Sequence, residues 1–344
     1  MESSKPRIMG GMFALEGISN ANSTTPRFLN EKLILLANAR SGIALVMGLL
    51  SPSCIWMPSY LCGSMLKAVN APMSSVKFYE VTYDLVPSSL DWLNNIQPKD
   101  LVVLVDYFGF PCNPHWIKRA KEQGAWVLED ACQALLSEEV GRFSDFVLFS
   151  PRKFLGIPDG GILTFHHQLA FDPELESPPA AWWLKAFSAI VLRREFDLQG
   201  GSRRWFELFQ ESELGAPIGP YAMSELSRML LQHSFDYRKI AQKRIENYQL
   251  LLDRLIEVAL FPSLPPGVVP LGFPIRVKNR DQVRRALFDH EIYPPVHWPI
   301  KGIIPEKFRG SHQLSAEIMT LPCDQRYNRR DMEQMAGLVA ELLQ

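Results

Sequence analysis

Cysteine is scarce in this chain, and the sequence lacks the patterns of a disulfide framework, a metal site or a membrane span. Its five cysteines (Cys54, Cys62, Cys112, Cys132 and Cys323) are odd in number and scattered, which predicts reduced thiols in a cytoplasmic protein. The seven histidines show neither HExxH nor paired CxxC spacing, so we predict no metal site. No apolar run approaches the ~20 residues needed to cross a bilayer, and the N-terminus has no apolar signal core.

An excess of charge of one sign is also missing. The chain carries 36 Lys and Arg against 37 Asp and Glu, a formal net charge of −1, so nothing predicts nucleic acid or an anionic membrane as a partner. A glycine-rich dinucleotide fingerprint after the first strand is absent as well, which disfavours a plain nucleotide-binding protein. With 344 residues, 47% of them hydrophobic and 21% charged, the chain can form one large or two ordinary globular domains.

Short apolar runs alternate with helical patterns from residue 40 to 165. The run 101–105 is apolar on both faces, as in the centre of a parallel sheet. Alternating strands and helices predict an α/β fold with a mostly parallel sheet, in which ligands lie at the carboxyl ends of the strands. The predicted strands are 54–57, 75–81, 101–105, 125–130, 145–150 and 161–165, and the predicted helices are 60–69 and 114–123.

The remainder of the chain has a different composition. Residues 180–205 are rich in Trp and Arg, and we predict a helix over 180–196 followed by a mobile loop. Helical periodicity continues from 223 to 255, and a proline-rich stretch then leads into a small α+β unit. We therefore predict a large α/β domain over 1–238 and a small C-terminal α+β domain over 239–344.

Asp130 and Lys153 are the most informative pair. Asp130 ends one predicted strand, and Lys153 follows the next strand just before the glycines Gly160 and Gly161. A lysine amine can form a Schiff base with the aldehyde of pyridoxal phosphate (PLP), and a carboxylate can keep its ring nitrogen protonated. Taken alone, the pair could equally be a strand-end Asp and a solvated surface Lys.

Other candidates accompany this pair. Arg40 and Ser41 stand at a helix start, where backbone N–H groups could bind a phosphate or Ser41 could simply cap the helix. Gln133 could reach a ring oxygen or be a polar loop residue, and Tyr60 could pack on a planar cofactor or lie in the core. His297 and Trp298, among prolines, could line a substrate pocket, although a structural turn is the simpler alternative.

In this order, the segments resemble the DegT/DnrJ/EryC1/StrS family of PLP-dependent, fold-type-I aminotransferases over roughly residues 10–342. Residues 129–134 (EDACQA) look like the family's EDAAQA stretch, and 149–153 (FSPRK) with the following glycine pair look like its lysine segment. Residues 39–41 stand at its phosphate turn. Arg244 to Tyr248 match its RxxxY helix, and Thr320 to Pro322 its closing LP turn.

The resemblance implies roles for these residues. Lys153 would bond the cofactor and shuttle the proton, Asp130 would pair with the pyridinium, and Gln133 with the ring oxygen. The phosphate and the ring face would be held by the remaining candidates, which are Ser41, the Arg40 backbone and Ser150 for the phosphate, and Tyr60 or Cys62 for the ring. Members of the family are commonly homodimers with the site at the interface, and most aminate a nucleotide-linked keto sugar with glutamate as donor.

The chain also departs from the family pattern. Leu148 stands where the family's phosphate serine usually lies, and Ala39 replaces a glycine in the phosphate turn. Residues 220–223 (PYAM) replace the usual NxRM, whose Asn reaches the partner's phosphate. The cofactor side therefore looks retained while the substrate side looks divergent.

The sequence thus predicts a PLP-dependent aminotransferase that moves an amino group from an amino acid, glutamate by the resemblance, to a small carbonyl compound such as a nucleotide-linked keto sugar. Two alternatives stay open: a PLP-dependent dehydratase or lyase of the same fold, and a non-catalytic member that acts as a binding protein. The altered residues 217–223 and the Trp/Arg-rich 180–205 segment favour the second of these.

Overall fold

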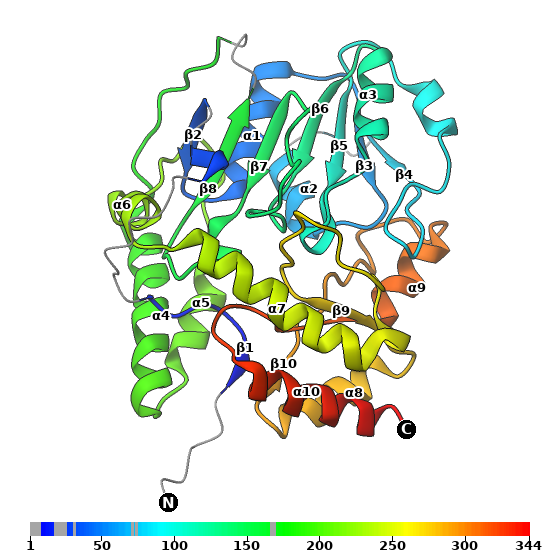
Figure 1. Ribbon diagram of the computed structural model, residues 1–344. Helices are drawn as coiled ribbons and strands as arrows, with labels where there is room; N and C mark the ends of the chain where they lie inside the picture. The colour runs from blue at the N-terminus through cyan, green and yellow to red at the C-terminus, as the bar shows by residue number, and fades with distance from the viewer. Residues whose placement is uncertain (1–7, 17–25, 30–31, 70–71, 73–74, 166–169) are drawn as a thin grey trace, which may run out of the picture.

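A seven-stranded sheet forms the upper part of the molecule (Figure 1), in a computed structural model that describes residues 8–16, 26–29, 32–69, 72, 75–165 and 170–344. The strand order is β2-β8-β7-β6-β5-β3-β4. Neighbouring strands from β4 through β3, β5 and β6 to β7 pair in parallel, and β8 is antiparallel to both of its neighbours, β7 and β2. The strands are β2 (Leu33–Leu36), β3 (Ile55–Pro58), β4 (Val76–Tyr79), β5 (Leu101–Val105), β6 (Trp126–Asp130), β7 (Phe146–Phe149) and β8 (Gly161–Phe165).

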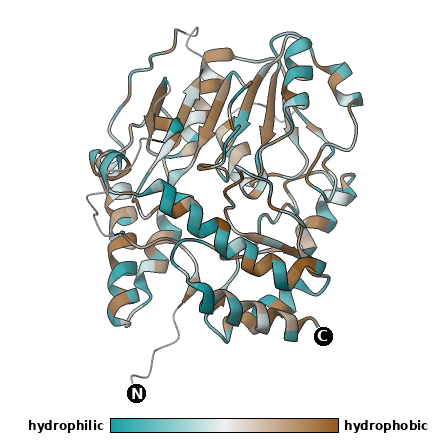
Figure 2. Cartoon of the chain, in the orientation of Figure 1, coloured by the Kyte–Doolittle hydropathy of each residue, from teal (hydrophilic) through white to brown (hydrophobic). Residues whose placement is uncertain are grey.

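The predicted α/β fold is confirmed, and it follows from the burial of the strands. Every residue of β5, β7 and β8 is buried, as expected for strands covered on both faces. Figure 2 shows hydrophobic residues along these strands and hydrophilic residues on the visible face of the first turns of α7. Helix α1 (Ala39–Leu50) packs on β7 and β8, and α3 (Pro114–Glu122) packs on β6.

A second group of elements lies below the sheet in Figure 1. The N-terminal strand β1 pairs in parallel with β10, so the start of the chain joins elements from its end. None of the helices in the described ranges is long and apolar enough to cross a membrane. The predicted boundary at residue 238 stays a prediction. These elements are β1 (Met9–Gly10), α7 (Tyr237–Leu255), β9 (Phe273–Arg276), α8 (Arg280–Phe288), β10 (Ile292–Tyr293), α9 (Arg309–Glu317), β11 (Ile318–Leu321) and α10 (Arg329–Leu342).

The structure corrects two predictions between the sheet and this second group. The predicted mobile loop after residue 196 is wrong, because α4 (Ala180–Gln199) is followed by a further helix, α5 (Arg204–Leu214), which packs along it. The continuous helical pattern from 223 to 255 is divided into α6 (Glu225–His233) and α7. Asp236 explains the division, since its side chain accepts the Lys239 N–H and starts a new helix.

The close approach of β8 to the start of α1 positions the lysine-bearing turn. A Cβ atom at Gly161 would lie 2.3 Å from the carbonyl carbon of Asn38 and 2.4 Å from the nitrogen of Ala39. Those are backbone atoms, which cannot rotate away. Gly160 N–H also donates to the Ala37 carbonyl at 2.8 Å, so the residues after Lys153 are tied to the first turn of α1.

We therefore expect Gly161→Ala to destabilise the fold. The added methyl group forces two backbone segments apart, and overpacking of this kind costs about 1–3 kcal/mol. The free energy of unfolding in urea measures the effect. The matched control is Gly48→Ala in the same region, where nothing lies within 4 Å of an added Cβ. Alanine there should stabilise α1 by about 0.5–1 kcal/mol, and equal effects of the two substitutions would contradict the argument.

Candidate active site

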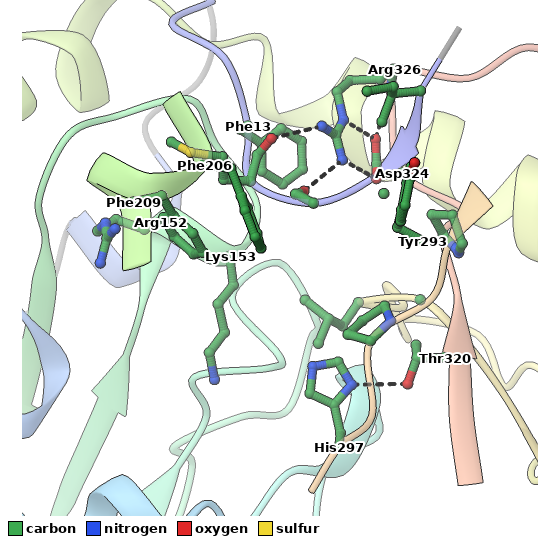
Figure 3. A pocket seen from close by; sticks show the side chains of 18 of the residues that line it. Phe13, Arg152, Lys153, Phe206, Phe209, Tyr293, His297, Thr320, Asp324 and Arg326 are labelled. Carbon is green, nitrogen blue, oxygen red and sulfur yellow. Dashed lines mark hydrogen bonds and ion pairs between the residues drawn. The ribbon is translucent and has the colours of Figure 1, made fainter. Parts of the chain in front are cut away.

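Lys153 is one of the residues that line a cavity between the sheet and the C-terminal elements. It ends a short 3₁₀ turn, η5 (Pro151–Lys153), directly after β7. The cavity has a volume of about 730 Å³, and Ser150, Lys153, His297 and Thr320 are among the residues that line it (Figure 3). The Lys153 amine makes no hydrogen bond or ion pair with any residue in the described part of the chain. An unpaired amine in a cavity is available for chemistry.

The structure brings Asp130 to the same edge of the sheet as Lys153. Strands β6 and β7 are parallel neighbours with Asp130 opposite Leu148, five residues before the lysine. One carboxylate oxygen of Asp130 accepts the Cys132 N–H at 3.0 Å. Burial raises the pKa of the Cys132 thiol well above its ordinary value; the charge of Asp130 adds to this and the charge of Lys153 opposes it. The charges of Asp130 and Lys153 therefore both act on the pKa of the Cys132 thiol, as expected when the two strands end at the same edge of the sheet.

Gln133 presents an unused hydrogen-bond donor. Its Oε1 accepts the Phe108 N–H at 2.8 Å, which fixes the amide plane. Its Nε2 is buried and has no partner among the described residues. A buried donor left unpaired costs about 1–3 kcal/mol, so this N–H group is free to bind an acceptor from outside the described residues. Neither Gln133 nor Asp130 is among the residues that line the cavity beside Lys153.

The structure places the predicted phosphate-binding residues in two different environments. Ser150 lines the cavity with Lys153. Ser41 is fully buried, and its hydroxyl accepts the Gly219 N–H at 3.4 Å. Asn38 caps α1 by accepting the Ser41 N–H at 3.2 Å, and both terminal nitrogens of Arg40 donate to the Glu213 carbonyl at 3.3 Å. Residues 213–219 therefore cover the first turn of α1.

Tyr60 and Cys62 also lie in different environments. Tyr60 has no exposed surface, and its hydroxyl donates to the His297 carbonyl. Burial raises the pKa of Tyr60 above its ordinary range. Cys62 is half-buried with its sulfur 3.1 Å from the Ser64 hydroxyl. Neither side chain lines the cavity, and of the two only Cys62 keeps exposed surface for a planar ligand.

His297 is held as a neutral imidazole at the lysine end of the cavity. Its Nδ1 lies 2.9 Å from the Thr320 hydroxyl, and Figure 3 shows His297 and Lys153 extending toward the same end of the cavity. Burial, helped by the charge of Lys153, lowers the pKa of His297 to about 3. Trp298 does not line the cavity; its ring packs against Tyr60 at 5.7 Å between centroids. Trp298 therefore packs against Tyr60 without facing the cavity.

One buried group of acids lies behind the site. Asp106, Cys112 and Glu129 bring ligand-type atoms within 4.8 Å of one another. Burial raises the pKa of Asp106 well above its ordinary value, and that of Glu129 as well. The raised pKa values favour an uncharged carboxyl in this group, which weakens its attraction for a cation. The absence of a metal from this protein stays a prediction.

Sequence reasoning missed the opposite end of the cavity, whose walls are aromatic. The Trp/Arg-rich composition of residues 180–205 indicated part of this end of the cavity. Aromatic side chains from this region reach the cavity because helix α5 forms and packs on α4. Another missed feature is the ion pair between Arg152 and Glu213, 2.6 Å long, on the wall beside Lys153. The aromatic side chains are Phe13, Trp205, Phe206, Phe209, Phe288 and Tyr293.

The residues present fit PLP. The cofactor needs a reactive amine, an anion for its ring nitrogen and a donor for its ring oxygen. An unpaired lysine amine, a strand-end carboxylate and an orphaned buried amide supply these three groups. The fit rests on Lys153, Asp130 and Gln133, the same three residues whose order in the sequence indicated the site.

Comparison with known proteins agrees with this chemistry. The DegT/DnrJ/EryC1/StrS aminotransferase family matches residues 74–340. No curated protein sequence matches the chain.

Solved structures share the fold at low sequence identity. Helicobacter pylori PseC, an aminotransferase involved in the biosynthesis of pseudoaminic acid, is 16% identical with a TM-score of 0.70, covering 98% of this chain and 99% of its own. DesV from S. venezuelae is 18% identical with a TM-score of 0.66, covering 92% and 87%. A putative sugar aminotransferase from Streptococcus pneumoniae is 14% identical with a TM-score of 0.67, covering 95% and 93%.

The pKa of His297 predicts a pH dependence of stability. Because it lies below the ordinary value of 6.5, the unfolded chain takes up the proton first as the pH falls. His297 therefore contributes stability above pH 6.5 that is lost on acidification toward pH 3. Between pH 7 and 4.5, the free energy of unfolding of the wild type should fall by about 2 kcal/mol more than that of His297→Asn.

Urea denaturation at both pH values measures this difference. The control His115→Asn removes an exposed histidine on α3 and should follow the wild type. If the difference in the free energy of unfolding between wild type and His297→Asn does not change with pH, the neutral, buried state of the His297 imidazole is contradicted.

Proposed function

Because the chain belongs to the DegT/DnrJ/EryC1/StrS aminotransferase family, whose members depend on PLP, we propose that it moves an amino group from an amino acid to a carbonyl substrate. The observation that carries the proposal is the Lys153 amine, unpaired among the described residues and facing a cavity at the end of β7. A lysine suits this task because it can bond a cofactor aldehyde reversibly and then act as a base.

Three side chains would hold the reactive end of the cofactor. PLP, when bound, supplies an electron sink that stabilises negative charge at the substrate α-carbon. Asp130 would accept a hydrogen bond from the ring N–H and so keep the ring nitrogen protonated, and the free Nε2 of Gln133 would donate to the ring oxygen. Lys153 would anchor the cofactor and, once released, move the proton at the substrate α-carbon.

The other predicted residues would hold the phosphate, the ring face and the substrate. Ser150 lines the cavity beside Lys153 and would donate to the phosphate, while the buried Ser41 and the Arg40 backbone would support the phosphate site from the start of α1. Tyr60 or Cys62 would cover the ring. On the substrate side, the neutral imidazole of His297 would offer a hydrogen bond without adding charge, and Trp298 would support it from behind.

A nucleotide-linked keto sugar is the acceptor that we propose, and glutamate is the donor. Support for the acceptor comes from a structure of the same fold, DesI, which was solved in the presence of its TDP-sugar product. DesI is 18% identical to this chain with a TM-score of 0.64, and the match covers 90% of this chain and 80% of DesI. The aromatic walls of the cavity are suited to a base and the arginines near them to phosphates.

A homodimer in the cytoplasm is the proposed assembly and location. Helices α4 and α5 expose large apolar side chains: Leu184 is 54% exposed, Leu198 71% and Leu214 82%. Apolar side chains gathered on one helical pair support a second copy that covers them. The proposal places the site at that interface.

The absorbance spectrum with added PLP tests the proposal. We expect a band near ~420 nm from the lysine-bound cofactor, and glutamate should bleach it as the amino group passes to the cofactor. Lys153→Ala should lose the band and about 10²–10⁴-fold of the activity. The control Lys67→Ala removes an exposed lysine on α2 (Gly63–Val69) and should behave as the wild type.

The outcomes separate the alternatives. Return of the band when a TDP-linked keto sugar is added to the glutamate-treated protein would support the acceptor class. A Lys153-dependent band that no amino acid bleaches would contradict amino transfer and favour a dehydratase, a lyase or a binding protein. Absence of the band in the wild type would overturn the PLP assignment.

A further inference from the structure

Arg152, Arg40 and Glu213 form a charged cluster beside Lys153. Arg152 Nη1 lies 2.6 Å from Glu213 Oε1, and both terminal nitrogens of Arg40 donate to the Glu213 carbonyl at 3.3 Å. Arg152, Lys153 and Glu213 share one wall of the cavity. Figure 3 shows Arg152 and Lys153 leaving the same short turn in different directions, so the guanidinium and the amine serve different parts of the site.

The cluster has more positive than negative charge. Burial alone would raise the pKa of Glu213, but Arg152, Arg40 and Lys153 outweigh it and lower that pKa. The Arg152 side chain is only 15% exposed, and its Nε is buried with no partner in the described residues. One carboxylate thus faces three cations, one of which keeps an unused donor. A further anion is favoured at such a place.

The position of the cluster indicates which anion it receives. Arg40 lies in the first turn of α1, and Gly161 packs directly on the backbone of Asn38 and Ala39. Ser41 is covered by Gly219, so its hydroxyl is not on the cavity wall. Arg152, in contrast, is one of the residues of that wall, and its guanidinium presents a planar fork suited to phosphate oxygens.

We infer, resting on the proposed function, that Arg152 positions the phosphate group of the cofactor and that Glu213 is an internal anion that holds Arg152 until the phosphate replaces it. Arg152 is a positioning residue, since it acts on a group remote from the reacting atoms. Glu213 lies at the end of α5, in the segment that covers the start of α1. The inference also accounts for Leu148 at the position of the family's phosphate serine, because an arginine four residues on supplies the missing donors.

Two ligands that differ only in the phosphate test the inference. We would measure the dissociation constants of PLP and of pyridoxal, which lacks the phosphate, for wild type, Arg152→Met, Arg152→Lys and Glu213→Gln. Arg152→Met should weaken PLP binding by roughly 10- to 100-fold, the range of a hydrogen bond to a charged group, and leave pyridoxal binding unchanged. Glu213→Gln should tighten PLP binding by roughly 3- to 10-fold, because a competing anion is removed. Arg152→Lys should recover part of the loss.

The ratio of the two constants is the decisive quantity, because a general folding defect changes both ligands alike. Arg119→Met is the matched control, since Arg119 pairs with the exposed Glu122 on the surface. Equal changes for PLP and pyridoxal in Arg152→Met, or weaker PLP binding in Glu213→Gln, would overturn the inference.

Inorganic phosphate separates this inference from the proposed function. Phosphate should raise the melting temperature of the wild type and of Arg119→Met, but not that of Arg152→Met. If the wild type gives no ~420 nm band with PLP, the proposed function fails, and a phosphate effect that needs Arg152 still supports the anion site. A phosphate effect that survives Arg152→Met would overturn the inference whatever the spectra show.

Discussion

The buried guanidinium of Arg244 in α7 joins the lysine-bearing turn to the rest of the molecule. Its Nη1 donates to the carbonyls of Pro270 and Leu271 at 3.1 and 3.0 Å, and its Nε donates to Gln325 at 2.9 Å. Its planar group lies 4.4 Å from the ring centroid of Phe154, the residue after Lys153 in the chain. Loss of one partner of such a buried charge costs several kcal/mol. Both walls of the cavity near Lys153 therefore depend on a single fully buried cation.

Neutral and charged side chains lie on different sides of Lys153. On one side, burial keeps the Tyr60 hydroxyl, the Cys132 thiol and the His297 imidazole in their neutral forms. On the other side, the Arg152 guanidinium lies 2.6 Å from the Glu213 carboxylate, so the charged groups gather there. A ligand with a neutral planar body and a charged end matches this division. The same division makes the lysine amine reactive toward a carbonyl, since no carboxylate in the described residues holds it in an ion pair.

Local sequence patterns predicted six of the seven strands of the large sheet and missed β2, the short edge strand at Leu33–Leu36. The run of five apolar residues at 101–105 predicts a strand buried on both faces, and Asp130 and Lys153 follow strands whose carboxyl ends meet. Helix α5 was missed because it is stabilised from a distance: Arg193 in α4 stacks on Trp205 at 4.5 Å. The division between α6 and α7, in contrast, had a local signal in the capping side chain of Asp236. The contact of Arg152 with Glu213 joins residues 61 positions apart, and no periodicity encodes it.

The far end of the cavity is built from parts of the chain that the lysine end does not use. Phe13 comes from the N-terminal segment, Phe206 from α5 and Phe288 from α8. Strand β1 is held in place by the hydroxyl of Tyr327, which accepts the Gly10 N–H at 2.6 Å. Since these residues come from segments outside the seven-stranded sheet, substitutions among them can change the far end of the cavity while Lys153, Asp130 and Gln133 stay in place. That separation allows the residues around Lys153 to keep the pattern of the family while other parts of the cavity depart from it.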